Sequence, residues 1–192
     1  GGILSYTAVF YAFVVLPFLD IITGQNKRNL SNEELMSKKK KWVFDAMLYL
    51  NIPLVFGLLL MVFTKIQTEV LATYELIGLS LSAGILLATN AINVAHELGH
   101  RGPYIERFMS KCLYMPCLYM HFYIEHNKGH HKHVATPEDP STAFYKQHLY
   151  AFWIQTFIGT QKKAWQIATA EAKGSLFNEM ALFQLIQFSL QR

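Results

Sequence analysis

A cluster of histidines in the middle of the sequence has the composition of a metal site. Seven of the eight histidines fall between His96 and His133. A buried structural histidine is usually solitary, whereas neutral imidazole is the commonest protein ligand for a transition metal. Metal binding therefore explains the crowding, and these histidines are the candidate chemistry of the chain.

The spacing of these histidines predicts metal ligands carried on helices. His96 and His100 are four residues apart, and so are His126 and His130, which would place each pair on one face of an α-helix. His131 follows His130 directly and would point about 100° away around such a helix. Two adjacent ligands that cannot face one ion indicate a second metal.

The donor set narrows the choice of metal. Ligation by nitrogen alone does not suit magnesium or calcium, and Cys112 and Cys117 lack the spacing of a thiolate motif, so iron, zinc and copper remain. The first motif, His-Glu-x-x-His, also occurs on the zinc helix of metalloproteases. The three histidines of the second motif argue against a peptidase, because one zinc would need only one further protein ligand. Five histidines are too few for two six-coordinate ions, so further ligands are expected from sequence outside this chain.

Four carboxylates lie near the histidines and are candidates for orienting them. Glu97 and Glu125 each adjoin a predicted ligand and would accept hydrogen bonds from imidazole N–H groups. Glu138 and Asp139 lie in a turn bracketed by prolines, where turn chemistry is the alternative to a role in orienting ligands. His121 is interpreted as a packing residue.

Three apolar segments before the histidines are long enough to cross a membrane. Charged residues make up only 16% of the chain, against about 25% in a soluble domain. A transmembrane helix needs about 20 residues, and the predicted spans are residues 3–23, 43–64 and 70–92. Residues 176–190 are interpreted as the start of a further span. The apolar run at 108–124 is too short and polar to span, and it predicts a helical pair.

The distribution of basic residues predicts the orientation of these spans. Of the 17 Lys and Arg residues, all but Lys65 lie in the loop after the first span or beyond the third. An excess of Lys and Arg marks the cytoplasmic side of a membrane, so the formal charge of +4 reflects topology and does not indicate nucleic-acid binding. We therefore predict an all-α protein of polytopic membrane helices, forming a single integral-membrane catalytic domain. Its histidine-box region, residues 96–145, would lie at the cytosolic face.

The motifs together closely resemble those of the integral-membrane alkane 1-monooxygenases. The matching sequences are His-Glu-Leu-Gly-His-Arg at 96–101, Glu-His-Asn-Lys-Gly-His-His at 125–131 and Val-Ala-Thr-Pro-Glu-Asp-Pro at 134–140. These enzymes are related to xylene monooxygenase and, more distantly, to membrane fatty-acid desaturases. Desaturases carry a shorter His-x-x-His-His box without the last sequence, so the second box with its tail is the specific part of the resemblance.

The resemblance implies a six-span fold in the bacterial inner membrane with a cytosolic non-haem diiron centre. The five iron ligands carried over are His96, His100, His126, His130 and His131. Such enzymes hydroxylate the terminal methyl group of an alkane with O2 and electrons from rubredoxin. The family has one further span before this sequence and two further spans and histidine motifs after it, so this chain is not expected to be active alone. The alternatives are a hydroxylase or desaturase acting on a xylene or a fatty acyl chain, a membrane zinc peptidase, and a non-catalytic scaffold.

A saturated alkane has no polar handle, so its binding must come from apolar burial, at about 0.8 kcal/mol per CH₂. Substrate dissolved in the bilayer would enter between the spans. Bulky residues of the first span and small residues of the third are predicted to flank a slot that limits chain length, with ordinary helix packing as the alternative. These residues are Phe10, Tyr11, Phe13, Ser82, Ala83 and Gly84.

Overall fold

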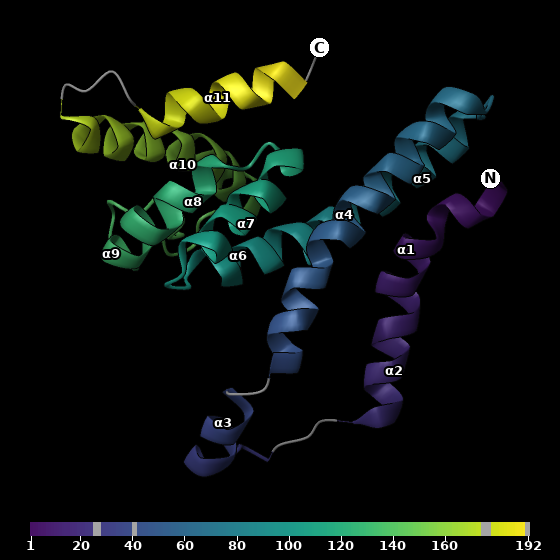
Figure 1. Cartoon of the computed structure of the whole chain (residues 1–192), viewed down its shortest axis with the longest axis horizontal. Helices are drawn as coiled ribbons and strands as arrows, with labels where there is room; N and C mark the ends of the chain where they lie inside the picture. The colour runs from purple at the N-terminus through teal and green to yellow at the C-terminus, as the bar shows by residue number, and fades with distance from the viewer. Residues whose placement is uncertain (25–27, 40–41, 174–177, 191–192) are drawn as a thin grey trace. The chain divides into compact units, whose positions relative to one another are not determined.

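The described part of the chain is helical throughout its regular structure, which confirms the predicted all-α class (Figure 1). A computed structural model describes residues 1–24, 28–39, 42–173 and 178–190. The chain forms two compact units, Gly1–Val94 and Ala95–Arg192, here named the N-terminal and C-terminal units. Whether they act as one catalytic domain stays a prediction.

Three long apolar helices dominate the N-terminal unit, as the sequence predicts. Helical residues Gly2–Thr23, Trp42–Thr68 and Thr73–Gly99 are each long and apolar enough to cross a membrane, because about 20 residues cover about 30 Å of hydrocarbon. The third continues beyond this unit and ends next to the first histidine pair. The elements of the unit are η1 (Gly2–Tyr6), α1 (Thr7–Phe10), η2 (Tyr11–Val15), α2 (Leu16–Thr23), α3 (Asn32–Lys39), α4 (Trp42–Thr68), α5 (Thr73–Leu86) and η3 (Leu87–Ile92).

A close approach at a glycine and several hydrogen bonds hold these helices together. At Gly78 of α5, a Cβ atom would lie 2.3 Å from Ser5 Oγ and 2.6 Å from the Tyr6 ring, so only glycine permits this approach. The Ser82 hydroxyl donates to the Ser5 carbonyl at 2.7 Å, and the Tyr6 hydroxyl donates to the Tyr74 carbonyl at 2.9 Å. Between α4 and η3, Asn90 Nδ2 donates to Asn51 Oδ1 at 2.9 Å. These polar side chains therefore find partners in the backbone or in another side chain, as hydrocarbon surroundings require.

The C-terminal unit carries the histidine boxes on short helices. The third apolar helix ends in α6 (Asn93–Gly99), which leads into this unit. The following elements are α7 (Tyr104–Tyr114), η4 (Met115–Cys117), α8 (His121–Glu125), η5 (His126–His130), α9 (His131–His133), α10 (Leu149–Ala172) and α11 (Glu179–Leu190). The apolar run at 108–124 thus folds as the expected helical pair, α7 and α8, broken at Leu118, whose φ is 52°.

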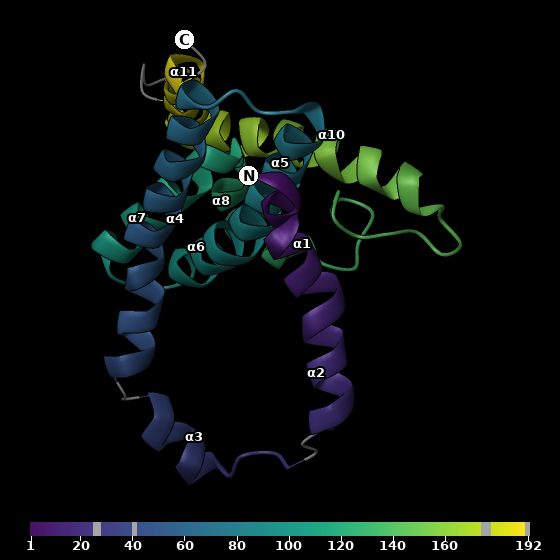
Figure 2. The same ribbon diagram turned by 90° about the vertical axis from the view of Figure 1, so that its right-hand side faces the viewer.

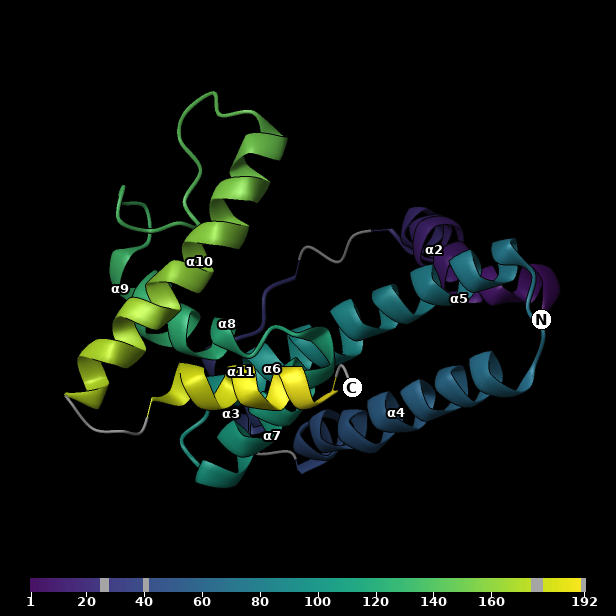
Figure 3. The ribbon, with the colours of Figure 1, turned by 90° about the horizontal axis from the view of Figure 1, so that it is seen from above.

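Helix α8 packs against α10 (Figures 2 and 3). His121 is fully buried between them, and Gln161 Nε2 donates to its Nδ1 at 2.9 Å. Burial lowers the pKa of His121 to about 4, so the ring is neutral at pH 7. His121 therefore lies in a packing position. Its hydrogen bond with Gln161 of α10 helps to orient α8, the helix that leads into the second box.

Some predicted features fall outside the described residues. Lys27, Lys40 and Lys41 contribute to the predicted topology but lie in parts that the structure leaves undescribed, as do residues 176 and 177 of the predicted fourth apolar segment. The described remainder of that segment is the apolar helix α11 (Glu179–Leu190), and its identification as the start of a further span stays a prediction.

Candidate metal centre

Four histidine side chains converge on one point of the C-terminal unit. His96 lies on α6, His100 directly after its end, His126 at the start of η5 and His131 at the start of α9. One ligand atom from each ring lies within 4.8 Å of all the others. The Nε2 atom of His126 is central, at 2.7 Å from that of His96, 3.2 Å from that of His100 and 3.1 Å from that of His131.

The second box reaches this arrangement through a π-helix. The backbone N–H of His131 bonds to the carbonyl of His126, five residues back, instead of to the residue four back. His131 therefore brings its Nε2 to 3.1 Å from that of His126, while the His130 ring stacks on the His126 ring and turns its Nδ1 toward Asp139. The backbone of the box is a π-helix and not the α-helix assumed from the sequence, and His131, not His130, joins His126 in the group of converging ligand atoms.

His130 turns toward the loop after the box. Its Nδ1 lies 2.9 Å from Asp139 Oδ2, and the ring stacks on that of His126 with centroids 5.2 Å apart. The Thr142 hydroxyl donates to the same Asp139 oxygen at 2.5 Å, and the Ser141 N–H donates to the other at 3.0 Å. Burial favours a raised pKa for Asp139, but these hydrogen bonds and that from His130 lower it.

An anionic Asp139 determines which tautomer His130 adopts. A carboxylate only accepts hydrogen bonds, so the His130 proton belongs on Nδ1 and the lone pair on Nε2. Carboxylate–histidine pairs of this kind orient imidazole ligands in metal sites. Of the four predicted orienting carboxylates, Asp139 is thus seen in direct contact with a predicted ligand.

Glu125 is buried directly behind the second box. Its two carboxylate oxygens have no hydrogen-bond partner among the described residues. Burial, followed by the charge of Asp139, raises the pKa of Glu125 to about 7. Gly129 provides the necessary space, because a Cβ there would lie 2.9 Å from Glu125 Oε1. A buried carboxyl group without a partner is costly, and a nearby cation would offset that cost.

The donor set fits a transition metal ion. Burial, and then the neighbouring histidines, lower the pKa of His126 to about 3, so its ring is neutral at pH 7. At metal–nitrogen bonds of about 2.1 Å, two nitrogens at right angles lie about 3 Å apart, close to the separations from His126. Four converging imidazoles with no oxygen or thiolate donor in the group suit iron, zinc or copper better than magnesium or calcium.

The remaining predicted orienting residues lie at the surface. Glu97 Oε1 is 3.4 Å from Arg101 Nε, and the Glu97 side chain is 57% exposed. Glu138 is exposed beside the buried Asp139, and a hydrogen bond from Thr136 is the main cause that lowers its pKa. A role for either in orienting ligands stays a prediction.

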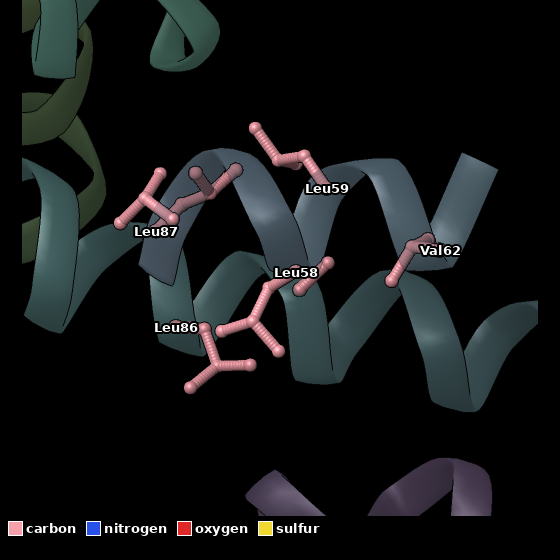
Figure 4. Close-up of a pocket in the computed structure, with 7 residues that line it drawn as sticks. Leu58, Leu59, Val62, Leu86 and Leu87 are labelled. Atoms are coloured by element: carbon pink, nitrogen blue, oxygen red, sulfur yellow. The ribbon is translucent and has the colours of Figure 1, made fainter. Parts of the chain in front are cut away.

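The predicted channel residues belong to the N-terminal unit, and three of the six, Phe10, Phe13 and Ala83, line two separate hollows, while Tyr11, Ser82 and Gly84 line neither. Phe10 and Phe13 are exposed and line one with other residues of the first helix. Ala83 lines another, where Leu58 of α4 and Leu86 of α5 meet (Figure 4). Its volume of about 40 Å³ is small beside the roughly 300–1,000 Å³ of pockets that hold small-molecule ligands. Ser82 instead bonds to Ser5. The predicted slot stays a prediction for the full-length protein.

Sequence reasoning missed the residues that hold Asp139 in place. Thr142 and Ser141 follow it at positions where hydroxyl and backbone groups commonly close turns. The Asp-Pro-Ser-Thr sequence at 139–142 is the signal that indicates this arrangement.

Long apolar helices and a histidine cluster together define a helical membrane protein with a metal-binding site. Residues 72–190 match the sequence model described as fatty acid desaturase, so the chain belongs to the fatty acid desaturase family. An alkane 1-monooxygenase of Pseudomonas putida is 35% identical over 158 residues, and that of Ectopseudomonas oleovorans is 34% identical over 163. The xylene/toluene monooxygenase hydroxylase component of Pseudomonas putida is 30% identical over 164 residues. These matches cover 82%, 82% and 81% of this chain, and 39%, 40% and 41% of the relatives. The chain therefore spans well under half the length of these relatives.

Proposed function

We propose that the full-length protein is a membrane non-haem diiron monooxygenase that hydroxylates the terminal methyl group of alkanes. It would use O2 and take electrons from rubredoxin. The observation that carries the proposal is the convergence of four imidazole nitrogens within 4.8 Å. The relatives named alkane 1-monooxygenase support the substrate class.

The arrangement of the histidines supports two metal ions. His96, His100, His126 and His131 share one focus, while His130 presents its Nε2 away from the Asp139 carboxylate. Iron, when bound, supplies the activation of O2. The protein keeps the His126 ring neutral by burial, fixes the tautomer of His130 and contributes a buried carboxyl group at Glu125. The remaining ligands would come from outside this chain.

The membrane setting completes the proposal. The excess of Lys and Arg on one side of the three apolar helices favours a cytoplasmic metal centre in the bacterial inner membrane. Alkane would enter from the bilayer, past residues of the first and third helices. The partners are therefore lipid, an apolar substrate and a small electron-transfer protein, with no role for nucleic acid.

Metal analysis and product analysis of the purified full-length protein test the proposal together. We expect about two irons per chain, and terminal alcohols from linear alkanes when O2, reductant and rubredoxin are supplied. One zinc and no oxygenated product would point to a peptidase, and a metal-free protein would point to a scaffold. The ion pair of Glu97 with Arg101 argues against the peptidase, in which this carboxylate would be the general base.

The xylene/toluene relative supports a second candidate, in which the substrate is an alkyl-substituted aromatic compound. The desaturase family itself adds fatty acyl chains as a third substrate class. Competition between an alkane, a xylene and a fatty acyl substrate in one assay separates them. A preference for xylene or for an acyl chain would overturn the alkane assignment while leaving the metal centre intact.

A further inference from the structure

Helix α10 exposes opposite kinds of side chain along its two halves. In the first half, residues 149–158, the exposed positions are almost all large and apolar. Trp153 is 57% exposed and Phe157 67% exposed. The full set of large apolar side chains exposed there is Leu149, Tyr150, Trp153, Ile154, Phe157 and Ile158.

The polar side chains of this half face the protein instead. Gln155 Nε2 donates to the carbonyls of Pro140 and Thr142, both at 3.1 Å. The Thr156 hydroxyl also donates to the Pro140 carbonyl at 3.1 Å. A helix at the surface of a water-soluble protein shows the reverse pattern, with its apolar stripe inward and its polar face outward.

The pattern reverts after Gly159. Lys162 and Gln166 are exposed, while Ala164 and Ala168 are buried against the unit. The second half therefore has the amphipathic order of a helix in water, and the first half has the order of a helix in an apolar medium. Figures 2 and 3 show the first half extending past the other helices of its unit.

We propose that the exposed face of α10 from Leu149 to Ile158 inserts into one leaflet of the lipid bilayer. This contact is separate from the three long apolar helices. Residues 147–161 contain no Asp, Glu, Lys or Arg, and Lys146 stands before them and Lys162 and Lys163 directly after. Cations at the edges of an apolar stretch suit anionic lipid headgroups, and Trp and Tyr are enriched at membrane interfaces.

The length of the apolar half fits partial insertion. Ten helical residues rise about 15 Å, which is half of the roughly 30 Å hydrocarbon thickness. Hydropathy averaged over the length of a membrane span does not detect the segment, because a window of that length also contains the polar residues after Gly159, Lys162 and Lys163 among them. Lipid is favoured over a protein partner because lysines border the apolar stripe at both of its ends.

Depth-dependent quenching of tryptophan fluorescence tests this proposal with a control on the same helix. The full-length protein is reconstituted into nanodiscs, with every tryptophan except Trp153 replaced by phenylalanine. A second variant keeps only Trp165, which is partly exposed on the second half of α10. Quenchers are lipids brominated high or low on the acyl chain. We expect Trp153 to lose about half its emission, most with the upper bromines, as for a helix buried about 5–10 Å. Trp165 should be unaffected.

Absence of quenching at Trp153 would overturn the proposal and mean that protein or water covers this face. Equal quenching of Trp153 and Trp165 would also overturn it, because the two halves would then share one environment. A second experiment, on the wild-type protein without substitutions, complements the fluorescence measurement. Diazirine-bearing lipid should label residues 149–158 of the wild-type protein and spare residues 162–173, and labelling of the second stretch alone would contradict the inference.

Discussion

Asp139→Asn should weaken the binding of a metal ion through His130 while leaving the fold intact. In the structure, Asp139 Oδ2 accepts hydrogen bonds from His130 Nδ1 and from the Thr142 hydroxyl, and Oδ1 accepts one from the Ser141 N–H. An asparagine must place an NH₂ group at one of these two positions. If the NH₂ group takes the place of Oδ1, it opposes the Ser141 N–H, so two donors face each other. If it takes the place of Oδ2, it opposes the His130 N–H unless the His130 proton moves to Nε2, the atom that would bind the metal.

The magnitude follows from the buried hydrogen bond that is lost. A buried polar group left without a partner costs about 1–3 kcal/mol. Removing a carboxylate that orients a metal-bound histidine typically lowers metal affinity about 10- to 100-fold, which is the same free energy. We therefore expect a shift of that size in the dissociation constant for one metal ion and little change for the other.

Anaerobic titration of the metal-free full-length protein with Fe(II) measures this shift. Glu138→Gln is the matched control, because it removes the same charge one residue earlier from an exposed side chain. Circular dichroism verifies that both variants keep their helix content. Superimposable titrations of Asp139→Asn and wild type would refute the argument that Asp139 holds the tautomer of His130.

Three further predictions concern ligation, pH and substrate length. His131→Ala should abolish turnover and lower the iron content, whereas His133→Ala should be nearly silent; half of the wild-type iron and activity in His131→Ala would contradict its place in the cluster. The pKa of His121 is lower in the folded protein than in the unfolded chain, so between pH 6.5 and about 4 the unfolded chain binds a proton that the folded protein does not. Metal-free protein should therefore lose stability as pH falls through this range. The loss approaches about 3 kcal/mol, and thermal melts of His121→Gln should show a weaker pH dependence; equal slopes would exclude His121 as the cause. Tyr11→Ala should shift products toward longer alkanes if the first helix closes a slot, and an unchanged length profile with lower activity would assign Tyr11 to helix packing.

The positions of the helices can be predicted from the sequence more accurately than the helical geometry within them. Apolar length alone predicts three long helices, because spanning a membrane leaves little choice of composition. The histidine motifs indicate a metal site, and four of the five predicted ligands converge in the structure. The sequence analysis assumed α-helical geometry for the second box, whereas the backbone forms a π-helix there. Gly129, at the centre of this π-helix, lies close to Ile167 of α10, a contact between segments that the histidine spacing does not encode.

Helix α10 shows a second limit of the sequence pattern. Its first half mixes polar and aromatic residues, and only the contacts of Gln155 and Thr156 with Pro140 and Thr142 reveal which face turns inward. The pairing of His130 with Asp139 likewise depends on the eight residues between them, which must fold back. Both arrangements are set by contacts between segments, so periodicity within one segment cannot predict them.

The π-helix at the second box accommodates one residue more than an α-helical turn would. In a π-helix, residues five apart stack as residues four apart do in an α-helix, so His126 and His131 meet despite the additional position between them. A box one residue shorter, with the spacing His-x-x-His-His, would bring its own first and last histidines together on an ordinary α-helix. Two boxes of different length would thus present the same outer pair of ligands. The two boxes would differ in the middle histidine, which is not part of this outer pair and can bind a partner of its own.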